Sequence, residues 1–488
     1  MSVHKDAPWS KDKMQRRGVA KFLTKYLDSN VEINVLNVNA PWGAGKTFFL
    51  ENWYGELREE RAVIYFNAWK HDYAGDAFVA LTAAIHDALK EFIPTAQVDS
   101  ALSDFRSKAA RAILAATPAI AKGVLKKVTG VDVSTVAEDV DAAESEASAD
   151  DDALLPTAAE KALEALLQSN GQTMRIVDDF KIKFSALAKE AAEAQAVCAA
   201  VEVRPLYIFI DELDRCRPTF SIELLERVKH FFDVKGCKFV IACDLEQLQH
   251  SVGAVYGAGF EGGKYLKRFF DAEYSLDYSR TEGWVKAQEF DAEKYLDIPV
   301  CSEAVDRSLI MWDDERQRVA SPSSNSVLAG VWGFDKFQII LLAISSTFGM
   351  KLRELEKCLK HLRAVQSSLY PKQVDLFFAM YLIALRDEAP QLYRRVIERN
   401  DVEDWRAIKA KYPSKALYYG YGNENVHDLA VNYFSLLSAD PEEVRRRSRD
   451  SDDAPSLSNY VLEQFLGRES HVNMRRYISY VDLAHSIE

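Results

Sequence analysis

The sequence predicts an α/β fold: a mainly parallel sheet flanked by helices, a helical insertion, and an α-helical C-terminal domain. Residues 33–39 alternate between apolar and polar side chains, whereas residues 206–210 and 237–243 are nearly continuous apolar runs. Continuous runs of this length are typical of strands buried on both faces of a parallel sheet. A glycine-rich turn follows the first run, and an aspartate follows each of the other two. We therefore expect polar chemistry where these strands end.

The turn after the first strand has the features of a phosphate-binding loop. Residues 40–47 read Ala-Pro-Trp-Gly-Ala-Gly-Lys-Thr, and a helical pattern starts near Lys46. Glycines let backbone N–H groups approach phosphate oxygens, Lys46 would neutralise the β- and γ-phosphates, and the Thr47 hydroxyl would bind Mg²⁺. Ala40 occupies the position of the usual first glycine, which we expect to weaken the turn geometry without abolishing binding. We assign nucleotide contacts to Pro41, Trp42, Gly43, Ala44, Gly45, Lys46, Thr47 and Phe48.

The second strand ends in an acidic pair, Asp211 and Glu212. Asp211 would hold Mg²⁺ through water together with Thr47, and Glu212 would act as the general base that polarises the attacking water. An acidic residue at a strand end is common, but its combination with a phosphate-binding loop makes the assignment specific. The adjacent glutamate favours hydrolysis of ATP over phosphoryl transfer to another substrate.

The third strand ends at Asp244. In nucleotide hydrolases with a catalytic glutamate, an additional strand lies between the loop strand and the acidic strand, and its tip carries a polar residue that senses the γ-phosphate. Asp244 fits this place. It also fits the N-cap of the helix that follows, and both roles are compatible.

These segments resemble the KAP family of P-loop NTPases. The resemblance rests on residues 42–47, 65–70 and 210–218, and continues through residues 242–248 and 264–268. It implies an ATPase of the additional-strand, catalytic-glutamate division. It also implies proteins that are often bacterial and repeatedly associated with phage exclusion or with membrane-associated assemblies.

Composition is consistent with a large cytoplasmic protein. The net charge of −13 over 488 residues argues against a surface that generally coats nucleic acid, although it leaves open binding of nucleic acid in one local basic groove. The six cysteines show no zinc-binding spacing, so we expect free thiols in a reducing compartment, and the nine histidines form no metal-binding motif in the sequence. The N-terminus carries early charges and no apolar signal segment.

We expect four parts: the first part of the NTPase core (1–94), a helical insertion (95–203) with an acidic linker (138–152), the second part of the core (204–284), and a helical lid and effector domain (285–488). Residues 109–125 are too short and alanine-rich to span a bilayer, but they allow interfacial contact at the inner membrane. A later stripe repeats at three- and four-residue steps and predicts one helix face. Docking of this face onto its own domain is favoured over an intermolecular coiled coil. The stripe comprises Val177, Phe180, Phe184, Leu187, Ala191, Ala194 and Cys198.

Three basic residues are further candidates for the nucleotide site. Lys267 and Arg268 lie in a predicted helical run, where a basic residue of ring- or dimer-forming relatives can act on a neighbour's ATP; the alternative is a simple helix-end charge. Arg353 lies in an amphipathic helix and resembles the sensor arginine of the helical lid in related ATPases.

The leading functional interpretation is an ATP-hydrolysing switch, with ATP and Mg²⁺ as ligands, that self-associates and acts through an unidentified protein partner. The alternatives are an ATP-binding scaffold with little turnover and a P-loop phosphotransferase. Anti-phage defence is implied by the family resemblance alone.

Overall fold

The computed structural model describes residues 7–73, 75–93, 105, 108–109, 155–257, 259–278, 281–296, 298, 300, 310–313, 316–319, 334–419, 422–450, 457–466 and 474–486. These residues form two compact units: the main division falls between Leu276 and Asp277, and residues 12–15 and 43–45 group with the second unit. The acidic linker expected at 138–152, the apolar stretch after Ala109, and Cys301 lie outside the described residues. The other cysteines are free thiols, as expected.

The first unit alternates strands and helices. Its elements are α1 (Arg17–Ser29), β1 (Val35–Asn39), α2 (Lys46–Leu57), β2 (Val63–Asn67), α3 (Ala68–His71), α4 (Ala77–Leu89), α8 (Leu155–Ala199), β3 (Leu206–Asp211), η2 (Leu213–Arg215), α9 (Pro218–Arg227), η3 (Val228–Phe232), β4 (Cys237–Cys243), α10 (Leu245–Tyr256), α11 (Gly262–Leu266) and β5 (Ala272–Ser275). The strands form one parallel sheet in the order β2-β3-β4-β1-β5. The predicted additional strand is therefore confirmed, because β4 lies between β1 and β3.

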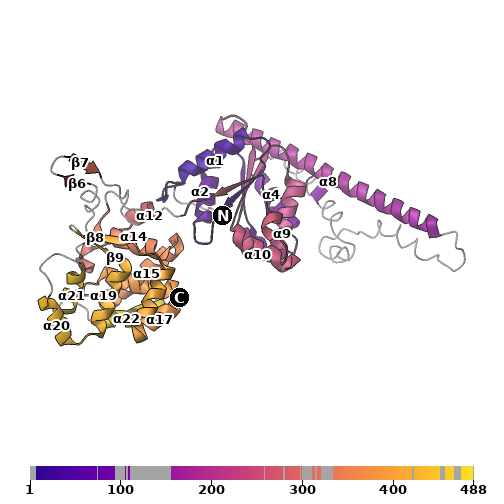
Figure 1. Ribbon diagram of the computed structural model, residues 1–488. Helices are drawn as coiled ribbons and strands as arrows, with labels where there is room; N and C mark the ends of the chain where they lie inside the picture. The colour runs from indigo at the N-terminus through magenta and orange to yellow at the C-terminus, as the bar shows by residue number, and fades with distance from the viewer. Residues whose placement is uncertain are drawn as a thin grey trace. The chain divides into compact units, whose positions relative to one another are not determined.

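The sheet is covered on both faces, as the apolar runs predict (Figure 1). On one face Phe209 of β3 packs its ring against Trp53 of α2 at 5.3 Å between centroids. The neighbouring residues Ile208 and Ile210 face the other side and join a core with α4, α8 and α9. Strands β3 and β4 are buried along their whole length, which places them at the centre of the sheet.

The predicted apolar stripe lies on α8 and docks onto its own unit. Phe180 and Phe184 are fully buried, and the Phe180 ring lies 5.3 Å from Phe78 of α4 and 5.4 Å from Phe232. The end of the stripe was predicted wrongly: Cys198 is exposed, and Ala196 is buried instead. A stripe with a 3.5-residue repeat rotates by about 20° per heptad around a straight 3.6-residue helix, so its last members turn away from the core.

The second unit is helical around a buried central helix. Its elements are α12 (Glu282–Lys286), η4 (Ala292–Lys294), β6 (Ile310–Asp313), β7 (Arg316–Val319), α14 (Lys336–Phe348), α15 (Leu352–Leu369), α16 (Leu376–Glu388), α17 (Pro390–Arg399), α18 (Val402–Lys411), β8 (Ala416–Tyr419), β9 (Gly422–Asn425), α19 (Val426–Ser438), α20 (Pro441–Asp450), α21 (Leu457–Leu466) and α22 (Met474–His485). The first ten residues of α16 are all buried, and α14, α15, α17, α19 and α22 pack around it. This helical architecture confirms the fold class predicted for the C-terminal region. Among the described helices of the whole chain, none combines the length and the apolar sequence that crossing a bilayer demands.

We predict that Phe180→Ala lowers the free energy of unfolding by about 3–5 kcal/mol, because the change leaves a cavity between α8 and the sheet. Chemical denaturation of the full chain measures the effect. The matched control is Ile182→Ala on the same helix, whose side chain is exposed and whose loss should change stability by at most about 0.5 kcal/mol. Equal, small effects from both variants would contradict the docking of α8.

Candidate nucleotide site

The phosphate-binding loop connects β1 to α2. Gly43 and Gly45 have φ angles of 81° and 83°, values that residues with a Cβ rarely adopt. Ala40 needs no such conformation: it is buried, and its N–H donates to the Cys243 carbonyl at 3.4 Å, which continues the β1–β4 ladder. Alanine in place of the usual first glycine is thus accommodated by the local backbone.

Lys46 begins α2 and is held by oxygen atoms of the first unit. Its Nζ donates to the Ala40 carbonyl at 2.7 Å and lies 3.4 Å from Asp214 Oδ2. The same carboxylate oxygen accepts from Trp42 Nε1 at 2.7 Å and from the Asp244 N–H at 2.9 Å. Asp214 therefore ties the loop, the acidic strand and the third strand together.

Asp214 is not among the site residues predicted from the sequence. The signal for its structural position was its spacing, three residues after Asp211 in the run of residues 211–215. That spacing does not reveal which groups the side chain contacts, because its partners Trp42, Lys46 and Asp244 come from two other strand ends.

Asp211 is the last residue of β3, and its carboxylate meets the loop helix. It accepts hydrogen bonds from the Tyr65 hydroxyl at 2.7 Å and from the Thr47 hydroxyl. Burial raises the pKa of Asp211 above its ordinary value, and these hydrogen bonds oppose the rise. A threonine hydroxyl beside a carboxylate is a donor set that suits Mg²⁺. The residues present therefore fit the predicted ion.

Glu212 has an unusual backbone conformation, and its carboxylate has two partners. Its φ and ψ are 60° and 30°, a left-handed conformation that costs an L-residue about 1–2 kcal/mol. Its carboxylate accepts from Asn67 Nδ2 at 2.8 Å and lies 2.9 Å from Arg215 Nη1. Asn67 is paired with Asp211 in the sheet register. The register therefore places the amide beside the glutamate.

Asp244 follows β4 and caps α10. Its carboxylate accepts from the Glu246 and Gln247 N–H groups at 3.1 and 3.3 Å. The predicted N-cap role is thus observed, and a role in sensing the γ-phosphate stays a prediction.

Lys267 and Arg268 are not part of this cluster. Lys267 and Arg268 were expected within a helical run, but α11 ends at Leu266 and both residues lie exposed in the turn before β5. The helix ends before these two residues because the chain must extend into β5, which begins four residues after Arg268. Arg353 lies on α15, and its backbone and the start of its side chain pack against Gly43, where a Cβ would come within 3.0 Å of Arg353 Cβ. Its contact with nucleotide stays a prediction.

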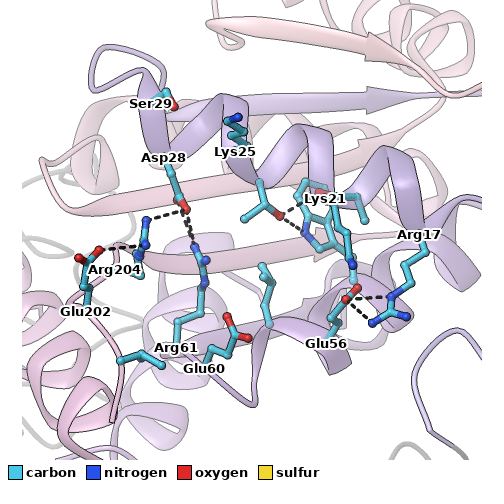
Figure 2. A pocket seen from close by; sticks show the side chains of 15 residues that line it. Arg17, Lys21, Lys25, Asp28, Ser29, Glu56, Glu60, Arg61, Glu202 and Arg204 are labelled. Atoms are coloured by element: carbon cyan, nitrogen blue, oxygen red, sulfur yellow. Dashed lines mark hydrogen bonds and ion pairs between the residues drawn. The ribbon is translucent and has the colours of Figure 1, made fainter. Parts of the chain in front are cut away.

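A separate hollow of about 690 Å³ lies in the first unit (Figure 2). It is lined by α1, the end of α2 and the segments that lead into β2 and β3, at the edge of the sheet opposite the phosphate-binding loop. Its charges are largely paired with one another: Arg61 donates to Asp28 at 3.1 Å, and Arg17 lies 3.0 Å from Glu56. We assign it no ligand.

Comparison with known proteins identifies the first unit. Residues 16–277 match the model of the KAP family P-loop domain. The comparison with curated proteins gave no match. Among solved structures, the ORC2 protein of Aeropyrum pernix, in its ADPNP-ADP complexes, aligns with 97% of this chain and 94% of its own at 11% identity and a TM-score of 0.30. A score that low carries no argument. The family match covers more than half of the 488 residues, and the chain therefore belongs to the KAP family of P-loop NTPases.

Proposed function

We propose that the chain binds and hydrolyses ATP with Mg²⁺ and works as a nucleotide-dependent switch. The observation that carries the proposal is the convergence of Lys46, Thr47, Asp211 and Glu212 where β1 and β3 end. When bound, Mg²⁺ would neutralise charge on the β- and γ-phosphates. Thr47 and Asp211 would hold the ion, and Lys46 would bind phosphate oxygens.

Turnover requires Glu212 to reach a water molecule. In the present arrangement, Asn67 and Arg215 occupy its carboxylate, and Asp214 faces Lys46. A triphosphate competes with Asp214 for the Lys46 ammonium. Since Asp214 also accepts from the Trp42 indole and the Asp244 N–H, binding at the loop perturbs two further strand ends. We propose that this redistribution couples nucleotide binding to the position of the base.

The geometry also bears on the alternatives. A scaffold without turnover has no need of a glutamate held in a left-handed conformation beside Asp211. A phosphotransferase commonly lacks both this glutamate and the additional strand, which here is β4. Both features favour hydrolysis.

Self-association is proposed from the position of Arg268. Asp271 bonds to Val35 at the start of β1, so Arg268 lies near the edge of the sheet where β1 begins. The phosphate-binding loop follows the other end of this strand, about 16 Å away. Arg268 is thus far from its own loop, and its side chain is exposed, so a neighbouring chain could meet it. A role in anti-phage defence through a protein partner is proposed from the family resemblance alone, and a cytoplasmic location is proposed from the composition and the free thiols.

We predict that Lys46→Ala abolishes ATP binding, because it removes the charge that offsets phosphate repulsion. Mg-ATP should raise the melting temperature of the wild type by mass action and leave the variant unchanged. Lys264→Ala is the control, since Lys264 is exposed and pairs only with Glu261 in the contacts the structure gives it. Circular dichroism without nucleotide checks that the variant folds. Equal stabilisation of Lys46→Ala and wild type by Mg-ATP would contradict the site.

We predict that Glu212→Gln binds ATP but hydrolyses it about 10²–10⁴-fold more slowly, because an amide cannot accept the proton of the attacking water. Phosphate release measures turnover, and thermal shift measures binding. Glu202→Gln, at an exposed glutamate, should match the wild type. Near-normal turnover of Glu212→Gln would place the base elsewhere.

We predict that specific activity rises with protein concentration and that mixing Arg268→Ala with Lys46→Ala restores part of the activity. In the mixture, an intact loop on one chain meets an intact Arg268 on its neighbour. The control mixes Lys46→Ala with Glu212→Gln, where each chain lacks a group that must act within its own site. Turnover that is independent of concentration, with no recovery in the first mixture, would exclude a shared site.

A further inference from the structure

Three potential metal ligands converge in the second unit. His361 lies on α15, Asp387 near the end of α16, and His485 is the last residue of α22. Their ligand atoms all lie within 4.8 Å of one another. Asp387 Oδ1 is 2.9 Å from His485 Nδ1, and Asp387 Oδ2 is 3.5 Å from His361 Nδ1. The carboxylate thus lies between the two imidazoles.

The cluster is buried and incompletely satisfied. The side chains of His361 and Asp387 are 9% and 7% exposed. His361 Nδ1, His485 Nδ1 and Asp387 Oδ2 have no hydrogen-bond partner of acceptable geometry among the described residues. Buried polar atoms in folded proteins are nearly always satisfied, so three such atoms pointing at one place require an explanation.

Another buried histidine of the same unit has a hydrogen-bond partner for each of its ring nitrogens. The ring nitrogens of His427 lie 2.9 Å from the Tyr381 hydroxyl and 2.8 Å from the Tyr412 carbonyl. Both nitrogens of that ring are therefore engaged within the protein. His361 and His485 instead direct Nδ1 towards a shared carboxylate without completing a hydrogen bond to it.

We propose that His361, Asp387 and His485 bind a divalent transition-metal ion, with Zn²⁺ the best match. Two imidazole nitrogens and one carboxylate are a ligand set that suits this ion, and a water molecule would complete four-coordination. Tetrahedral ligands at Zn²⁺ distances are about 3.3 Å apart. The separations of 2.9 Å from Asp387 Oδ1 to His485 Nδ1 and of 3.5 Å from Asp387 Oδ2 to His361 Nδ1 lie near this value, and all three ligand atoms lie within 4.8 Å of one another.

A metal ion at this site would compete with nearby positively charged side chains for the Asp387 carboxylate. Lys357 Nζ lies 3.1 Å from Asp387 Oδ1, but its side chain is half exposed, so water can replace Asp387 as its partner. Arg386 pairs with Asp482, a residue on α22. The ion therefore displaces one surface cation from Asp387 and replaces it with a stronger local charge.

The ion would link α22 to the central helix α16. His485 is on α22, which packs against α15 and α16. Because the three ligands come from three helices, binding joins them in a way that the unfolded chain cannot, and so stabilises the second unit. This inference is independent of the proposed ATPase activity.

The test uses the full chain, stripped with a chelator and studied without nucleotide so that the phosphate-binding loop contributes no ligand. We expect about one Zn²⁺ per chain by elemental analysis after reloading and desalting, and a higher melting temperature. Co²⁺ should give the absorption spectrum of a tetrahedral nitrogen–oxygen site. His361→Ala and His485→Ala should each lose the bound ion and the spectrum. The control His250→Ala, at an exposed histidine of the first unit, should retain both.

Asp211→Asn separates this site from the one proposed for Mg²⁺, and it should retain Zn²⁺. If His361→Ala fails to fold, the half-buried His485 supplies the second measurement through His485→Gln, which keeps a polar side chain. A wild type that takes up no Zn²⁺, or that holds it equally after both histidine substitutions, would overturn the proposal and leave a hydrogen-bonded cluster only.

Discussion

The nucleotide site depends on the parallel pairing of β1, β4 and β3. Parallel strands bring their carboxyl ends to one edge of the sheet. Here that edge receives the phosphate-binding loop after Asn39, Asp211 at the end of β3, and Asp244 after β4. The register is fixed by burial, because both central strands are enclosed along their whole length and a shift by one residue would exchange the side chains of their two faces. The apolar cores on the two sides thus position the polar groups at the edge.

Asp214 links the strand ends at this edge through its hydrogen bonds and its ion pair. A buried carboxylate is costly unless it is paired and hydrogen-bonded, and Asp214 meets that requirement with one partner from each of two other strand ends and with Lys46. A change in one partner therefore alters the hydrogen bonding of the others through the shared carboxylate. The same requirement explains why Trp42, a large residue in a loop that otherwise favours small ones, has a place: its indole N–H satisfies the carboxylate.

The sequence was informative wherever a function depends on local spacing. Strand periodicity and the spacing of glycine, lysine and threonine gave the sheet, the loop and the acidic pair, because each is encoded within ten residues. The distant partner of Glu212, Asn67, could not be obtained in this way. Asn67 precedes it by 145 residues, and only the register of β2 against β3 makes the two neighbours. The misplacement of Cys198 has a different cause, since the pattern was read with a repeat slightly shorter than the true helical period.

The histidine–aspartate cluster could not be predicted from the spacing of residues in the sequence. Metal sites that can be recognised in a sequence place at least two ligands within one turn or loop. His361, Asp387 and His485 share no such segment, and the nine histidines are scattered along the chain. What unites the three is the packing of α15 and α22 against a central helix that is buried nearly throughout. A polar group near the end of such a helix can be tolerated only where other polar groups meet it, so the apolar sequence of α16 determines where the cluster forms, although it supplies only one of the ligands.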